Sequence, residues 1–132
     1  LEFIKNDLER AMEVARAENK PVFVDFTGHT CSNCRLMENT VFQQPEVRER
    51  LAQMVRVALY TDEPGEVGER WQEHQIERYN TFSLPYYVIV SPQDQDLAAW
   101  GKGLTRDPAE FVEFLDFGLA KARDAQLAAA IP

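Results

Sequence analysis

Cysteine and histidine are scarce in this sequence, with two of each among 132 residues. A tetrahedral zinc site takes four ligands. The cysteine and histidine side chains available as ligands are Cys31, Cys34, His29 and the distant His74. That set would be unusual, so we expect no metal site. Arg35 follows the second cysteine, which excludes the pattern of covalent haem attachment. One closely spaced pair does not build a disulfide framework. A redox-active cysteine pair remains, and it needs no metal or organic cofactor.

Positive charge is also in short supply. Fourteen Lys and Arg residues stand against 22 Asp and Glu residues, for a net charge of -8. Nucleic acids and anionic membranes need a basic surface, so neither is expected as a partner. No segment approaches the ~18 apolar residues that cross a bilayer. The chain begins with Leu1 rather than Met, and we therefore expect residues 1–132 to be one domain excised from a longer protein, with any signal peptide or membrane anchor outside it.

Strand and helix patterns alternate along the chain, which predicts an α/β architecture around one core. The last two strands read as an antiparallel hairpin on an otherwise parallel sheet. The expected strands are a short edge strand at 3–4 and longer ones at 22–26, 55–60, 86–90 and 97–100.

Several helix boundaries carry capping signals. Asn6 with Glu9 three residues later reads as a capping box that opens a helix through about residue 18. Asp107 and Pro108 likewise open the last helix. The helix that follows the cysteines should break before Pro45, since proline suits a first helical turn. The remaining expected helices are 45–51 and 69–79.

The cysteine pair carries the chemistry. Cys31 follows a strand and a loop and lies at the start of a predicted helix, whose unpaired N–H groups stabilise a thiolate. Cys34 is three residues on, so both sulfurs lie on one side of the first turn. We assign Cys31 as the nucleophile that attacks a partner's disulfide. Cys34 resolves the mixed disulfide by attacking Cys31.

Two carboxylates are candidates for handling the proton. Asp25 interrupts an apolar strand, where an unpaired charge is costly, so its pKa should be raised; the alternative is that it points to a solvated edge. Glu38 lies four residues after Cys34 on the same helix face. It is either a second proton-handling group beside the sulfurs or an exposed helix glutamate. His29 and Arg35 could add positive potential near the thiolate, but ordinary exposed positions are favoured for both.

Leu84-Pro85 immediately precedes a strand, and base rates for a single X-Pro bond favour trans. Taken together with Asp25, Cys31 and Cys34, however, this pair makes nearly the whole chain resemble the thioredoxin superfamily. The resemblance implies a thioredoxin fold, with a central mixed sheet of four to five strands flanked by helices on both faces. It also implies a buried, proton-handling Asp25 and a cis Pro85 that faces the cysteines.

A closer resemblance is to the C-terminal domain of DsbD-type thiol:disulfide interchange proteins. It rests on the run 20–26, the cysteine motif, Glu38 and the stretch 42–47 with its proline. It implies an extracytoplasmic reductant that takes electrons from a membrane-embedded domain and passes them to partner proteins through transient mixed disulfides. Asp25 and Glu38 would then be the acidic pair near the cysteines.

Thr30, Leu84 and Pro85 are the expected docking surface, and the resemblance implies that the backbone at Leu84 pairs with an extended segment of the partner. The interface should be small, and the protein a monomer. Thioredoxin itself has Trp before the first cysteine and Gly-Pro between the two, whereas this chain has Thr30 and Ser32-Asn33. Residues between the cysteines tune the reduction potential, so the direction of electron flow stays open.

Three alternatives remain. One is an oxidase or isomerase on the same fold, which needs a stabilised Cys31 thiolate; the two nearby carboxylates argue against it. Another is a thioredoxin-like binding module with an idle disulfide. The third is a stand-alone cytosolic reductase fed by a soluble flavoprotein.

Overall fold

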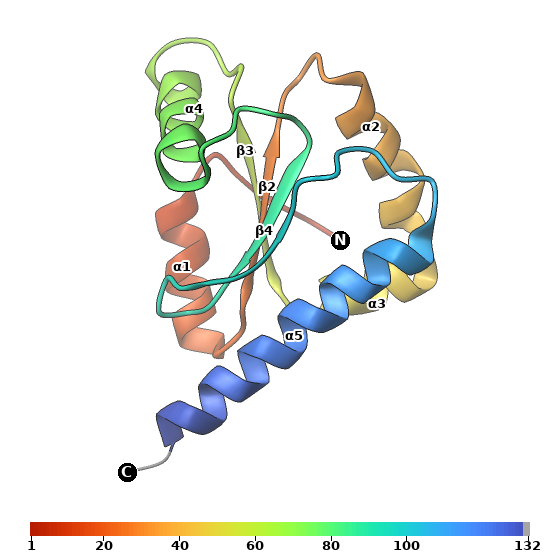
Figure 1. Cartoon of the computed structure of the whole chain (residues 1–132). Helices are drawn as coiled ribbons and strands as arrows, with labels where there is room; N and C mark the ends of the chain where they lie inside the picture. The colour runs from red at the N-terminus through yellow and green to blue at the C-terminus, as the bar shows by residue number, and fades with distance from the viewer. Residues whose placement is uncertain (131–132) are drawn as a thin grey trace.

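A five-stranded sheet forms the centre of the computed structural model, which describes residues 1–130 (Figure 1). The strands lie in the order β1-β3-β2-β4-β5. β1, β3 and β2 are parallel, β4 runs antiparallel to β2, and β5 antiparallel to β4. This confirms the predicted mixed sheet with its terminal hairpin. The strand bounds are β1 (Ile4–Lys5), β2 (Val22–Thr27), β3 (Val55–Tyr60), β4 (Tyr86–Val90) and β5 (Asp96–Trp100).

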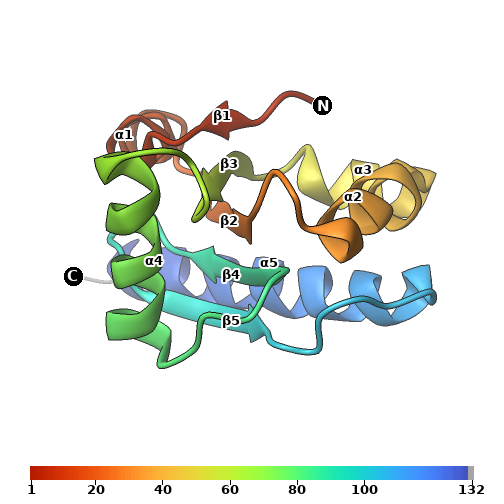
Figure 2. The ribbon, with the colours of Figure 1, turned by 90° about the horizontal axis from the view of Figure 1, so that it is seen from above.

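Helices cover both faces of the sheet (Figure 2). One face is covered by α1 (Leu8–Glu18) and α4 (Glu66–Tyr79), and the other by α2 (Ser32–Asn39), the short 3-10 helix η1 (Val41–Gln43), α3 (Pro45–Leu51) and α5 (Pro108–Ala130). The break before Pro45 is confirmed, and so is the Asp107 cap, whose carboxylate accepts from the Ala109 N–H at 3.1 Å. Within residues 1–130, no helix is long and apolar enough to cross a bilayer.

Side chains of β2 divide between two hydrophobic cores, because successive residues of a strand point to opposite faces. All six residues of β2 are buried. Phe23 belongs to the core under α2, α3 and α5, whereas Val24 and Phe26 belong to the core under α1 and α4. By the same alternation, Asp25 and Thr27 lie on the Phe23 side. The carboxyl of Asp25 therefore faces the layer that contains the cysteine helix.

The start of α1 corrects one prediction. Asn6 is not the N-cap; Asp7 is, and its side chain accepts from the Arg10 N–H at 3.0 Å. Asn6 has a positive φ of 55° and its side-chain oxygen accepts from the Tyr60 N–H at 2.8 Å. The spacing to Glu9 indicated a capping box, but Asn6 is held by a strand 54 residues away, which local sequence does not reveal. Other boundaries shift as well: β1 lies one residue later, β2 ends one residue later, β5 begins one residue earlier and α4 begins three residues earlier than predicted.

Candidate active site

The two cysteines lie where β2 passes into α2. Cys31 is the N-cap of α2, in extended backbone conformation, and its Sγ accepts from the Cys34 N–H at 3.2 Å. The pair forms a disulfide with the Cα atoms 5.2 Å apart. Cys31 is partly exposed, whereas Cys34 is buried, with 1% of its surface accessible. A partner sulfur can therefore approach Cys31 and not Cys34, which supports the order of attack expected from the sequence.

Asp25 is buried, with 3% of its surface accessible, so the solvated-edge alternative is wrong. Its Oδ1 has no hydrogen-bond partner. Burial raises the pKa of Asp25 well above its ordinary value, the Glu38 charge raises it further, and Arg35 works in the opposite direction. A carboxyl whose pKa is raised in this way can exchange a proton with a neighbouring group. Its part in the reaction stays a prediction.

Glu38 is engaged by Arg35 on the same helix. The Arg35 guanidinium donates to Glu38 Oε2 from Nε at 3.0 Å and from Nη2 at 2.6 Å. Nη2 also donates to Thr27 Oγ1 on β2 at 2.9 Å. Both charged side chains are only about one-third accessible (36% and 35%), so Arg35 is not the plain exposed position that the sequence favoured. The i, i+3 spacing is a signal from which this pair could have been predicted.

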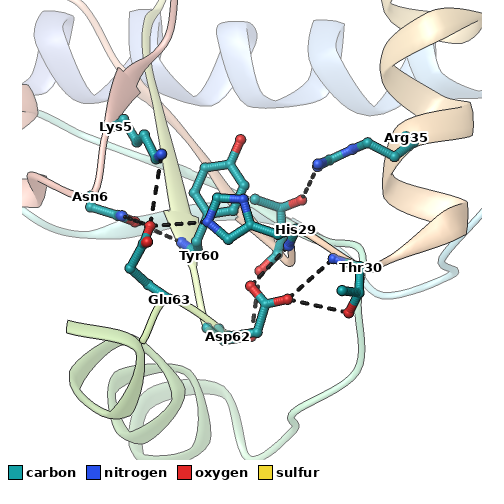
Figure 3. A network of polar contacts seen from close by, with 10 residues as sticks. Lys5, Asn6, His29, Thr30, Arg35, Tyr60, Asp62 and Glu63 are labelled. Atoms are coloured by element: carbon teal, nitrogen blue, oxygen red, sulfur yellow. Dashed lines mark hydrogen bonds and ion pairs between the residues drawn. The ribbon is translucent and has the colours of Figure 1, made fainter. Parts of the chain in front are cut away.

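The loop before Cys31 is held by the loop after β3 (Figure 3). The Asp62 carboxylate accepts from the backbone N–H groups of His29 at 2.8 Å and Thr30 at 3.2 Å, and from the Thr30 hydroxyl at 3.4 Å. His29 stacks on Tyr60, with ring centroids 4.1 Å apart, and its Nε2 lies 3.0 Å from Glu63 Oε1. His29 is thus engaged with this loop, and its side chain is 39% exposed.

These contacts also set the protonation of the acidic loop. Partial burial by itself would raise the pKa of Asp62, but the hydrogen bonds from His29 and Thr30 lower it below its ordinary value. The hydrogen bond with His29 lowers the pKa of Glu63. The role of Asp62 is not evident from the sequence, because its only local signal is an acidic loop.

The loop before β4 closes the site from the other side. The Leu84-Pro85 peptide bond is cis, as the resemblance implied. Leu84 lies against the cysteine loop, since a Cβ placed on Gly28 would come within 3.3 Å of Leu84 Cδ1. Thr30 is exposed, Leu84 half-buried and Pro85 buried. The structure thus brings the predicted docking residues to one end of the sheet, and their contact with a partner stays a prediction.

No group of three or more His, Cys, Asp or Glu side chains in residues 1–130 is arranged to hold a metal ion. The candidate site consists of the disulfide, the carboxyl of Asp25 and the Arg35–Glu38 pair.

Comparison with known proteins supports this description. The DsbD 1 thiol:disulfide interchange protein of Pseudomonas aeruginosa is 29% identical over 87 residues, which are 64% of this chain and 14% of that protein. A thioredoxin from Thermus thermophilus matches the structure with a TM-score of 0.74 at 22% identity, covering 96% of this chain and 94% of that one. The reduced C-terminal domain of DsbD from Neisseria meningitidis gives a TM-score of 0.62 at 24% identity, covering 86% and 97%.

The structural matches confirm the thioredoxin fold, and the Pseudomonas relative confirms the closer resemblance to DsbD. The chain spans only 14% of that relative's length, so the likeness concerns one domain of it. A family profile described as a thioredoxin-like domain matches residues 8–119. The chain therefore belongs to the family of thioredoxin-like domains.

Proposed function

We propose that this chain is a protein-disulfide reductase that relays electrons to partner proteins through Cys31 and Cys34. One observation carries the proposal: a disulfide at the start of α2 has one accessible sulfur and one buried one, above a sheet face that holds the buried carboxyl of Asp25. This arrangement separates the group that meets the partner from the groups that complete the reaction inside the protein.

The reaction starts from the dithiol. The Cys31 thiolate attacks one sulfur of the partner's disulfide, a mixed disulfide forms, and the partner's other sulfur leaves as a thiolate. Cys34 then passes its proton to the Asp25 carboxylate and attacks the Cys31 sulfur. The partner leaves as its second thiolate with two electrons gained, and the Cys31–Cys34 disulfide remains. Asp25 suits the acceptor role because a raised pKa brings a carboxyl nearer to that of a thiol.

The similarity to DsbD supports a place for this chain in the larger reaction. The electron donor would be a membrane-embedded domain, and the chain would act as an extracytoplasmic domain of a longer membrane protein. The acceptors would be proteins that dock at Thr30, Leu84 and Pro85. Thr30 is exposed beside Cys31, and Leu84 lies against Gly28 of the cysteine loop, which supports docking at this end of the sheet. No metal or organic cofactor takes part.

The test is the reduction potential of the Cys31–Cys34 couple, measured by equilibration in glutathione or dithiothreitol buffers. We expect a value of about -270 to -230 mV, in the range of reductants with this fold. A value near about -120 mV would make the protein an oxidase. If no reversible two-electron couple is found, the protein would instead be a thioredoxin-like binding module with an idle disulfide.

A trapping experiment tests the roles of the two cysteines. The Cys34→Ser variant should accumulate a mixed disulfide with a reducible partner such as insulin, because the resolving thiol is missing. The matched Cys31→Ser variant should accumulate little, since the remaining sulfur is buried. Equal trapping by both variants would contradict the assignment of Cys31 as nucleophile.

A further inference from the structure

Arg35 links helix α2 to strand β2 through a three-way contact. Its guanidinium joins the Glu38 carboxylate, on the next turn of α2, to the Thr27 hydroxyl on β2. Thr27 is 1% accessible and lies on the same face of β2 as Asp25, two residues further along the strand. The Arg35–Glu38 ion pair is thereby hydrogen-bonded to a buried residue of the sheet.

This anchoring fixes where the charge of Glu38 lies. A free glutamate at this position could rotate toward the sulfurs and take a proton from them. In the structure, one oxygen of its carboxylate accepts both Arg35 hydrogen bonds. Charge-assisted hydrogen bonds of this kind are about twice as strong as neutral ones. The Arg35 charge therefore offsets part of the effect of Glu38 on Asp25.

The other groups that face Asp25 are neutral near pH 7. Tyr87 of β4 pairs with Asp25 across the sheet, and burial, together with the nearby carboxylates, raises its pKa. The Arg35 guanidinium carbon lies 5.9 Å from the centroid of the Tyr60 ring on β3, and burial raises the pKa of Tyr60 as well. Among the side chains that act on Asp25, the charges that compete are thus those of Glu38 and Arg35.

On this basis we infer that Arg35 is a positioning residue for the cysteine pair: it pins Glu38 to β2 through Thr27 and offsets its charge, leaving Asp25 to exchange the proton. The inference rests on the proposed function and deepens it. With Arg35 in place, the carboxylates disfavour the Cys31 thiolate less than two free carboxylates would. The reductant then keeps a thiolate fraction sufficient for attack.

The Arg35→Gln variant removes the cation and keeps a side chain of similar length. In the reduced protein, the rate at which iodoacetamide alkylates Cys31 reports its thiolate fraction as a function of pH. We expect about three- to tenfold slower alkylation at pH 7, because one pKa unit of a thiol corresponds to about tenfold in thiolate. The midpoint of the pH profile should rise correspondingly. Arg35→Lys keeps the charge without the planar guanidinium fork. Its alkylation rate should therefore lie between those of Arg35→Gln and the unaltered protein.

Two further variants separate positioning through Glu38 from a general effect of charge. Arg48→Gln makes the same change of charge on α3, where Arg48 contacts Gln43, and should leave the profile unchanged. In a Glu38→Gln background, the Arg35→Gln substitution should lose most of its effect, since there is no longer a carboxylate to hold. Unfolding midpoints of all variants show that each is folded under the assay conditions.

The inference fails if Arg35→Gln and Arg48→Gln give the same alkylation profile. It fails also if Arg35→Gln slows alkylation equally with and without Glu38, because the guanidinium would then act on the sulfur directly. Alkylation needs no protein partner. The outcome is therefore independent of the proposed function, which insulin reduction by the unaltered protein tests separately.

Discussion

The side-chain amide of Gln75 donates a hydrogen bond of 2.8 Å to the backbone carbonyl of Ser83. Gln75 lies on α4 and is fully buried, and its own Oε1 has no hydrogen-bond partner. Ser83 immediately precedes Leu84 and the cis Pro85. The loop that we expect to meet the partner is thus fastened to α4 from inside the protein. The hydrogen bond from Gln75 ties this loop to α4, while the unpaired Oε1 carries a desolvation cost.

Replacing Gln75 by Leu should loosen the docking loop while changing stability little. The loss of the donor and the removal of the unpaired oxygen oppose each other, so we expect the free energy of unfolding to change by less than about 1 kcal/mol. The KM for insulin should rise about threefold, equivalent to about 0.65 kcal/mol, with the reduction potential unchanged. Gln53→Leu is the matched control, because Gln53 bonds the Glu49 carbonyl at the surface. An unchanged KM for Gln75→Leu would show that the loop needs no such anchor.

The raised pKa of Asp25 predicts the pH dependence of stability. The folded pKa lies above the unfolded value of about 4, so the folded state is favoured below that value and loses stability as pH rises through the folded pKa. Asp25→Asn should therefore be more stable than the unaltered protein at pH 8, by an amount on the order of 1 kcal/mol, because the variant has no charge to bury. The free energies of unfolding of the two proteins should converge toward pH 4.

Urea unfolding of the oxidised protein measures this difference without interference, because the cysteines do not titrate in the disulfide. The histidines contribute equally to both proteins and cancel in the comparison. Asp124→Asn, at an exposed position of α5, provides the control and should not change the pH slope. Parallel pH profiles for Asp25→Asn and the unaltered protein would contradict the raised pKa.

Asp62 should support the cysteine loop chiefly through its hydrogen bonds. Asp62→Ala removes the acceptor for His29 and Thr30, and a loss of about 1 kcal/mol is expected because the site is solvent-exposed. Since the pKa of Asp62 is lowered, its contribution is present above the unfolded pKa of about 4 and lost as pH falls through the folded value. The difference in free energy of unfolding between Asp62→Ala and the unaltered protein should therefore shrink below pH 4. Asp62→Asn keeps one acceptor oxygen, so its stability should lie between theirs. A difference that persists unchanged at low pH would assign the loss to packing instead.

The parts of the site that the sequence predicted are those with a local pattern. The sequence predicts the strands 55–60 and 86–90 to the residue, because each is a run of β-branched, aromatic and other apolar residues that only Arg56 interrupts. Cys31 and Asp25 stood out for the same reason, as reactive or charged groups beside such a run. The missed contacts join distant residues: Asp62 and His29 are 33 positions apart, and their proximity depends on the pairing of β2 with β3.

Helix α5 packs against β4 at Gly118, where no side chain fits. A Cβ placed on Gly118 would overlap Cδ1 of Ile89 and lie 3.2 Å from its Cβ. Ile89 is fully buried in the core under α5, so it has little space to move away. Glycine weakens a helix by about 1 kcal/mol relative to alanine, and its presence here reflects the need for close approach.

Gly118→Ala should consequently destabilise the protein although it improves helix propensity. Overpacking typically costs about 1–3 kcal/mol, which exceeds the gain in propensity. Ile89→Val removes the Cδ1 that the new methyl group meets, at a cost of about 0.5–1.5 kcal/mol on its own. The double variant should therefore be more stable than the sum of the two single losses, measured by urea unfolding, because the larger clash is gone. Strictly additive losses would mean that Gly118 is kept for a reason other than contact with Ile89, since two substitutions that share one volume must interact.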